Sequence, residues 1–385
     1  MATINLPRIV RAGAGAFNET PEALAQCGLS RPFIVTDRFL VDQGTAGRLA
    51  DLLIRAGMTT QIFADTVPDP TVAVVEAALA RFDEGAHDCV IGLGGGSPID
   101  TAKAVAALAR ERRPIPAMKA PAVTDTPGLP IIAIPTTAGT GSEATRFTIL
   151  TDEATSEKML CAGLAFLPMI AIVDYELTMT KPRRLTADTG IDSLTHAIEA
   201  YVSRRANPFS DAMALSAMRL IAGNLRRACD APDDRAAREA MMIGAHHAGI
   251  AFSNASVALV HGMSRPIGAF FHVPHGLSNA MLLPAVTRFS SPAARSRYAD
   301  CARAMGVARE DEGEQAAVAR LIAELVALNA DLAVPSPRAH GIDQSEYMSL
   351  IPTMAAQAIA SGSPANNPRA ATAEEIAALY REAYG

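Results

Sequence analysis

Apolar and polar residues follow one another along the first half of the chain in a pattern that predicts alternating strands and helices. Short apolar runs of strand length alternate with longer segments that carry apolar residues at helical spacing. Strands are predicted at 33–36, 61–64, 89–92, 130–134 and 171–174, and helices at 47–56, 71–83 and 97–110. Strands that alternate with helices are typical of βαβ units, so we expect a parallel sheet covered on both faces.

The pattern changes beyond this α/β region. Two alternating runs, 145–150 and 158–162, are joined by the polar stretch 152–157 and predict a hairpin. After about Lys181 helices dominate, most clearly at 187–203, 210–230, 235–253, 315–329 and 372–384. We therefore expect an α/β domain at residues 1–182 and an all-helical domain at residues 183–385.

Composition narrows the class of protein. A chain of 385 residues corresponds to two or three domains of roughly 150 residues. Its net charge of −6 argues against a nucleic-acid partner, and no apolar stretch reaches the roughly 18 residues of a membrane span. The five cysteines form no CxxC pair, and the chain starts without an apolar leader, so we expect a cytoplasmic protein without disulfides.

A glycine-rich segment is the first candidate for chemistry. Gly94, Gly95 and Gly96 follow a predicted strand and precede the helix at 97–110. Consecutive glycines let backbone N–H groups approach a phosphate, and a helix start adds unpaired donors. The segment is neither Gly-x-Gly-x-x-Gly nor a P-loop. A capping box of Ser97 and Asp100 is the alternative, but it does not require three glycines, so phosphate binding is favoured.

Other polar residues lie where predicted strands end. Asp37 follows the strand at 33–36, where a carboxylate can accept hydrogen bonds from a ribose diol and repel a 2′-phosphate. Capping of a helix or turn explains Asp37 equally well. The Thr- and Gly-rich stretch 135–143 follows the strand at 130–134 and offers hydroxyls at the same edge of the sheet, although it can also be a plain loop.

The helical half contains four candidate metal ligands. Asp192 and His196 are four residues apart, which places both on one face of a helix. His261 and His275 are each followed by glycine. One carboxylate and three imidazoles can hold Fe²⁺ or Zn²⁺, but histidines more often have structural roles. Spacing alone does not exclude the remaining candidates, which are His246, His247 and His272.

Taken together, these segments resemble the iron-containing (group III) alcohol dehydrogenase family, whose fold is like that of dehydroquinate synthase. The resemblance is carried by Gly94-Gly95-Gly96-Ser97-Pro98-x-Asp100, by 135–143, by Gly190-x-Asp192-x-x-Thr195-His196-Ala197-Ile198-Glu199-Ala200-Tyr201, by His261-Gly262, by Pro274-His275-Gly276 and by Asn367-Pro368-Arg369. Order and separation match over nearly the whole chain. The resemblance implies an NAD-binding domain at 1–182, a metal-binding helical domain at 183–385, and an active site in the cleft between them.

The resemblance also implies roles for single residues. The metal ligands are Asp192, His196, His261 and His275; the residues around the pyrophosphate are Gly95, Gly96, Ser97 and Asp100; other cofactor contacts are Asp37, Asp69, Thr136, Thr137 and Lys158. The family commonly has a second His, often assigned to proton relay, where this chain has Arg265. A guanidinium cannot act as a base at pH 7, so we expect water, a cofactor hydroxyl or His272 to exchange the proton. Arg265 then either holds an anionic substrate group or makes a structural contact.

The resulting interpretation is an NAD- and iron-dependent alcohol dehydrogenase or aldehyde reductase, with Zn²⁺ as a second metal. Its substrate is a small alcohol, an aldehyde or a hydroxy-acid, and NAD is expected over NADP because of Asp37. The family implies a homodimer or a larger homo-oligomer. One alternative is a sugar-phosphate lyase or cyclase of the dehydroquinate synthase type. The other is a sensor that binds NAD or metal without turnover.

Overall fold

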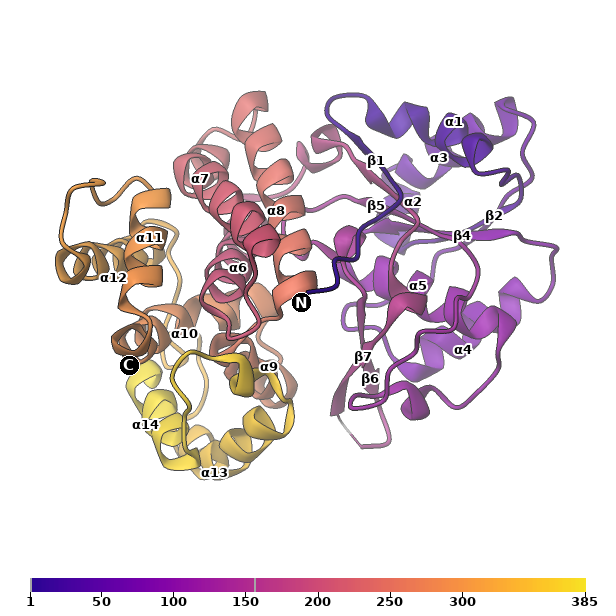
Figure 1. Ribbon diagram of the computed structural model, residues 1–385. Helices are drawn as coiled ribbons and strands as arrows, with labels where there is room; N and C mark the ends of the chain where they lie inside the picture. The colour runs from indigo at the N-terminus through magenta and orange to yellow at the C-terminus, as the bar shows by residue number, and fades with distance from the viewer. Residues whose placement is uncertain (1, 156) are drawn as a thin grey trace. The chain divides into compact units, whose positions relative to one another are not determined.

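The chain folds into two compact units (Figure 1). The computed structural model describes residues 2–155 and 157–385. One unit is Asn5–Thr180, and the other is Lys181–Gly385 together with the residues up to Ile4.

A six-stranded parallel sheet forms the centre of the Asn5–Thr180 unit. The strands are β1 (Ile9–Ala12), β2 (Pro32–Val35), β3 (Gln61–Phe63), β4 (Cys89–Gly94), β5 (Ile131–Pro135) and β8 (Ile170–Val173). Their order is β1-β8-β5-β4-β2-β3, and every pair is parallel. This confirms the predicted sheet and its five predicted strands. The edge strand β1 was not predicted.

The predicted hairpin is confirmed as a second, two-stranded sheet. Strands β6 (Phe147–Asp152) and β7 (Glu157–Ala162) pair antiparallel. The predicted connection between them includes Ser156, which lies outside the described residues. Five 3₁₀ helices connect the regular elements of this unit: η1 (Ala16–Glu19), η2 (Ile115–Met118), η3 (Ser142–Ala144), η4 (Leu164–Phe166) and η5 (Tyr175–Thr178).

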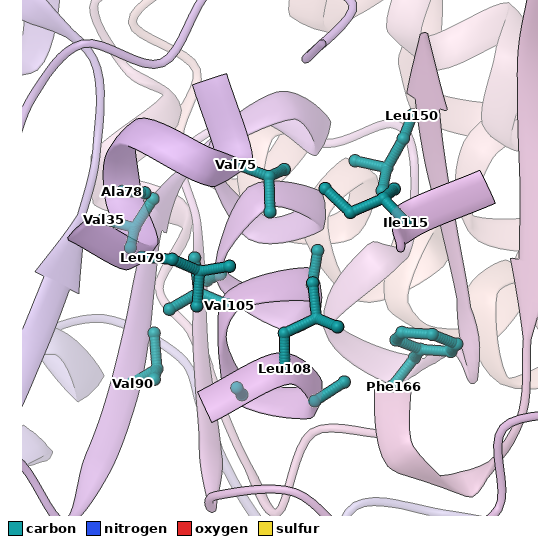
Figure 2. Packing of buried hydrophobic residues seen from close by; sticks show 14 of the residues in the cluster. Val35, Val75, Ala78, Leu79, Val90, Val105, Leu108, Ile115, Leu150 and Phe166 are labelled. Carbon is teal, nitrogen blue, oxygen red and sulfur yellow. The ribbon is translucent and has the colours of Figure 1, made fainter. Parts of the chain in front are cut away.

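Helices cover both faces of the parallel sheet. They are α1 (Thr20–Gln26), α2 (Arg38–Asp42), α3 (Thr45–Arg55), α4 (Val72–Phe82) and α5 (Gly96–Arg110). Neighbouring residues of a strand point to opposite faces, so Val35 joins one buried cluster and Ile34 joins another. The Val35 cluster gathers Val75 and Leu79 of α4 with Val105 and Leu108 of α5 (Figure 2). These two apolar layers fix the ends of β2, β4 and β5, where the candidate cofactor residues lie.

The Lys181–Gly385 unit is all-helical over its described residues. Its helices are α6 (Arg183–Val202), α7 (Pro208–Asp230), α8 (Arg235–Ala255), α9 (Leu259–Phe271), α10 (His275–Ser290), α11 (Arg295–Ala304), α12 (Glu314–Asp331), α13 (Gln344–Ala360) and α14 (Ala373–Tyr384), with 3₁₀ helices η6 (Ser291–Ala293) and η7 (Ser363–Asn366). The five predicted helices are confirmed. Helix α6 is buried along most of its length and packs against α7, α8 and α10.

Two further expectations can be compared with the structure. Among the described residues, no helix has the length and apolar character that crossing a bilayer requires. All five cysteines are free, as their spacing predicted. Burial raises the pKa of the Cys229 thiol to about 11, which keeps it as an unreactive thiol at neutral pH.

Candidate functional site

Three helices of the Lys181–Gly385 unit bring the four predicted metal ligands together. Helix α6 contributes Asp192 and His196, α9 contributes His261, and α10 begins with His275. One ligand atom from each lies within 4.8 Å of all the others. Asp192 Oδ1 lies 3.5 Å from His261 Nε2 and 3.8 Å from Nε2 of both His196 and His275. The sequence predicted all four residues, and the structure gathers them at one point.

Burial and charge suit this cluster to a divalent cation. Three of the residues are buried, whereas the His275 side chain is 40% exposed, so the cluster is open to solvent on that side. Burial acts to raise the pKa of Asp192, but the surrounding imidazoles of His196, His275 and His261 outweigh it and hold the pKa well below its usual range. Asp192 is therefore a carboxylate at neutral pH. One carboxylate and three imidazoles suit iron or zinc.

An asparagine that sequence analysis missed faces the same point. Asn279 is fully buried, and its Nδ2 donates to Asp192 Oδ1 at 2.7 Å. The same nitrogen lies 3.1 Å from His261 Nε2 and 3.2 Å from His275 Nε2. Its Oδ1 has no hydrogen-bond partner among the described residues. Three acceptor atoms thus surround one amide nitrogen, which has two hydrogens to share among them. The same three atoms can offer their lone pairs to a cation. Spacing of four residues from His275 was the only signal in the sequence.

A close approach of two helices sets the position of His275. A Cβ atom on Gly276 would lie 2.3 Å from the backbone oxygen of Asp188 and 3.3 Å from Cβ of Asp192. Any side chain at Gly276 would therefore push the start of α10 away from α6. This explains physically why glycine follows the histidine at this position.

Arg265 and His272 occupy different surroundings on α9. Arg265 lies one turn after His261, is half-buried, and donates from Nη1 to Ser363 Oγ at 3.0 Å. Burial lowers the pKa of Arg265 to about 10, so the group remains a cation at neutral pH. His272 is exposed at the end of α9, with a left-handed φ of 54°. Arg265 thus bonds to a side-chain hydroxyl, and both of its predicted roles stay predictions.

The glycine-rich segment links β4 to α5, although not by the predicted capping box. The N-cap residue of α5 is Gly95, and no side chain caps the helix. The capping-box alternative is therefore wrong, because α5 starts at Gly96 and places Ser97 inside the first turn. A Cβ on Gly94, whose φ is 153°, would lie 2.4 Å from Pro98 Cγ. Backbone N–H groups of an uncapped first turn can bind a phosphate.

The threonine-rich loop lies beside this helix start. Strands β4 and β5 pair so that Gly94 is opposite Pro135, and the Thr136 N–H donates to Gly94 O at 2.9 Å. A Cβ on Gly96 would lie 3.0 Å from Thr140 Cγ2, and one on Gly95 would lie 3.6 Å from Thr137. The two loops predicted to bind cofactor are thus neighbours at the carboxyl ends of adjacent strands, where open α/β sheets bind ligands.

Asp37 caps a helix, which is one of its two predicted interpretations, and its contact with a cofactor stays a prediction. It follows β2, which neighbours β4 in the sheet, and is the N-cap of α2. Its Oδ1 accepts from Leu40 N at 2.9 Å, so capping is confirmed for this oxygen. Two other predicted cofactor residues form an ion pair with each other: Lys158 Nζ of β7 lies 2.9 Å from Asp69 Oδ1. Asp69 has a left-handed φ of 52°.

Asp100 points into a polar network rather than toward a free helix end. Its Oδ1 accepts from Ser142 Oγ at 2.7 Å, and its Oδ2 accepts from Ile149 N at 2.9 Å. Lys103, which the sequence analysis missed, is fully buried and donates to the backbone oxygens of Thr145 and Phe147. The one signal for Lys103 was a single charge in an Ala- and Val-rich run. The network ties α5 to the 142–149 segment.

These features together indicate a class of enzyme. A parallel α/β unit with an uncapped glycine-rich helix start, and a helical unit with an Asp-His₃ cluster, are expected of a metal-dependent dehydrogenase that uses a dinucleotide. Residues 7–175 match the iron-containing alcohol dehydrogenases, and residues 186–384 match the C-terminal region of the Fe-containing alcohol dehydrogenase family. The chain belongs to the iron-containing alcohol dehydrogenase family.

Similar proteins agree with this family. The chain is 37% identical over 374 residues to a lactaldehyde reductase of Escherichia coli K12, which covers 97% of each chain. It is 36% identical over 383 residues to an NAD-dependent methanol dehydrogenase of Bacillus methanolicus, which covers 100% of each. The solved structure of a 1,3-propanediol oxidoreductase superposes with a TM-score of 0.95 at 36% identity, again over 100% of both chains.

The family confirms several predictions. The fold class is confirmed, and so is the class of enzyme: the protein is an oxidoreductase of alcohols and aldehydes. The predicted cofactors agree with the iron in the family's description and with the NAD in the name of the methanol dehydrogenase. The match favours the dehydrogenase over a lyase or cyclase and over a sensor.

Proposed function

We propose that this chain transfers hydride between a small alcohol or aldehyde and NAD, with Fe²⁺ held by Asp192, His196, His261 and His275. The observation that carries the proposal is the convergence of their four ligand atoms within 4.8 Å. When bound, the metal supplies Lewis-acid polarisation of the substrate oxygen, and NAD accepts or donates the hydride. Zn²⁺ suits the same donor set and is the second candidate metal.

We assign NAD to the α/β domain, residues 1–182, and the metal to residues 183–385. The backbone of Gly95, Gly96 and Ser97 would bind the pyrophosphate at the uncapped start of α5. The remaining cofactor contacts are assigned to Asp37, Asp69, Thr136, Thr137 and Lys158, which lie at or beside the same edge of the sheet or on the hairpin. Both oxygens of Asp100 already accept hydrogen bonds, so we assign Asp100 to positioning the 142–149 segment.

The substrate is proposed to be small and neutral. The names of the relatives refer to lactaldehyde, methanol and 1,3-propanediol, which carry no charge. A hydroxy-acid is the second candidate, and one observation favours it: Arg265 is a half-buried cation whose hydrogen-bond partner, Ser363, is neutral. Proton exchange is assigned to water, to a cofactor hydroxyl or to His272, because Arg265 cannot act as a base at neutral pH.

We also propose that the protein works as a homodimer or larger homo-oligomer in the cytoplasm, with neither nucleic acid nor membrane as a partner. Five free cysteines support a reducing compartment. Size-exclusion chromatography with light scattering would test the oligomer, because a purely monomeric species at micromolar concentration would contradict it. Cell fractionation would test the compartment.

Replacement of metal ligands tests the proposal directly. We expect His261→Ala and His275→Ala to lose both stoichiometric metal and turnover while NAD⁺ binding persists, because the ligands and the NAD-binding residues lie in different units. Elemental analysis, NADH absorbance with small alcohols and aldehydes, and calorimetry with NAD⁺ measure the three properties. His247→Ala is the matched control, since His247 contacts Ser216 and lies outside the four-ligand cluster. Full metal occupancy in both ligand variants would overturn the assignment.

A further inference from the structure

Glu199 is a buried carboxylate to which no part of the proposed reaction assigns a role. It lies on α6 three residues after His196 and seven after Asp192, so the three share one face of the helix. Its Oε2 accepts from Ala258 N at 2.9 Å and lies 2.7 Å from His261 Nδ1. Its Oε1 accepts from Val260 N at 2.6 Å. All of these partners belong to the start of α9.

We propose that Glu199 is the positioning residue of the metal centre, which fixes His261 so that Nε2 faces the other three ligands. A carboxylate has no hydrogen to donate, so Nδ1 of His261 carries the hydrogen in this pair. Nε2 is then the unprotonated nitrogen, and it lies 3.5 Å from Asp192 Oδ1. The pair selects the tautomer that can bind a cation at Nε2.

The same carboxylate also fixes the helix that carries His261. The N-cap of α9 is Ala258, and no side chain of the cap residue bonds to the helix. Glu199 instead satisfies N–H groups at this end, and its negative charge suits the positive end of the helix dipole. The backbone and the imidazole of His261 are thereby held by one group from the helix that carries two other ligands. This inference rests on the proposed metal site.

Metal affinity in a double-mutant cycle tests the inference. Metal-free wild type, Glu199→Gln, Glu199→Ala, His261→Ala and Glu199→Gln/His261→Ala are titrated with Zn²⁺ against a chromophoric chelator. We expect each single Glu199 variant to lose about 10- to 100-fold in Zn²⁺ affinity. His261→Ala keeps three of the four ligands and should bind Zn²⁺ too weakly to retain it stoichiometrically, so this background is titrated at Zn²⁺ concentrations high enough to reach saturation. There Glu199→Gln should add almost no further loss of affinity, because its effect passes through His261.

Controls separate this role from a general loss of stability. Glu324→Gln removes a carboxylate that pairs with Arg226 in the same unit and should leave Zn²⁺ affinity unchanged. Unchanged affinity in Glu199→Gln, or an equal loss with and without His261, would overturn the inference alone. Absence of Zn²⁺ and Fe²⁺ binding by wild type would instead overturn the proposed function, and the inference with it.

A measurement on the unaltered protein covers the case in which the variants do not fold. Long-range ¹H–¹⁵N spectra of metal-free wild type report the tautomer of each histidine, and His261→Ala identifies the His261 signals by their loss. We expect His261 to carry its hydrogen on Nδ1. A neutral His261 with the hydrogen on Nε2 would overturn the inference.

Discussion

Arg265 carries a positive charge that its neighbouring hydroxyl does not neutralise. Its Nη1 donates to Ser363 Oγ at 3.0 Å, and burial lowers its pKa only to about 10. If this charge binds a substrate carboxylate, Arg265→Ala will raise KM for a hydroxy-acid about 10- to 150-fold more than for a neutral alcohol of similar size, through loss of a charge-assisted hydrogen bond. Steady-state kinetics on such a pair measure the difference.

Ser363→Ala is the matched control for this prediction, because it removes the hydrogen-bond partner and keeps the charge. It should leave the ratio of the two KM values near that of wild type. Equal losses on the acidic and the neutral substrate in Arg265→Ala would rule out anion recognition by the guanidinium and leave it a structural role.

Asp37 is the residue on which the expected preference for NAD over NADP depends. Its helix-capping bond and its negative charge can be removed separately by substitution. Serine is also a favourable N-cap, so Asp37→Ser keeps the bond to Leu40 N within reach and removes the negative charge. We expect the preference for NAD over NADP to narrow in Asp37→Ser without loss of stability. Asp37→Ala should narrow it similarly but cost about 0.5–2 kcal/mol of unfolding free energy. A wild type that prefers NADPH would contradict the role of Asp37.

Some residues of the candidate site could be predicted from the sequence, and others could not. The four metal ligands belong to motifs whose spacing and order predicted them, such as Asp192 and His196, which are four residues apart on one helix. Glu199 and Asn279 could not be assigned, because their roles depend on contacts with residues far away in the chain. Glu199 lies 62 residues from His261, and Asn279 lies 87 residues from Asp192. Such contacts exist only once α6, α9 and α10 are packed.

At the scale of elements, prediction succeeded where the periodic pattern was uninterrupted. Strands β2, β4, β5 and β8 are fully buried, so they read as continuous apolar runs. Strand β1 alternates between half-buried and exposed residues over only four positions and gave no such run. Helices α9 and α10 contain Pro266 and Pro284, which broke the helical pattern. Packing of their apolar faces overrides this local cost.

The contact between α5 and β6 depends on one buried lysine. Lys103 donates to Thr145 Oγ1 and to two backbone oxygens, and it lies near the carboxylates of Asp100 and Glu143. Lys103→Met would leave these groups without their cation. Removal of one member of a buried charged network costs about 3–5 kcal/mol, which is the loss expected in urea unfolding.

A surface lysine of the same unit is the control for Lys103. Lys119 forms an ion pair with Glu157 at 2.6 Å, but its side chain is 41% exposed. Lys119→Met should therefore cost less than about 1 kcal/mol. Similar losses in the two variants would show that the Lys103 network contributes no more to stability than a solvated ion pair.

At the scale of the whole molecule, the proposed NAD-binding residues and the proposed metal ligands lie in different units. Each unit is compact by its own internal contacts, and the α/β unit contains all of the proposed NAD contacts. The helical unit contains all four proposed metal ligands. The sequence signal for a boundary near Lys181 is the change from alternating strands and helices to helices alone. A ligand that binds only the native state stabilises it, so NAD and the metal should each stabilise the unit to which they bind.

Hydrogen exchange on the full chain can measure that linkage region by region. A metal present at 100 times its Kd stabilises the native state by about 2.7 kcal/mol. Amide hydrogens that exchange only after the metal-binding region opens should then exchange about 100-fold more slowly. We expect Zn²⁺ to slow exchange in α6, α9 and α10, because their side chains share the ion. NAD⁺ should instead slow exchange at the start of α5 and in residues 136–143. Protection of Asn5–Thr180 by Zn²⁺ with no change in α9 and α10 would place the metal in the wrong unit and refute the assignment of its ligands.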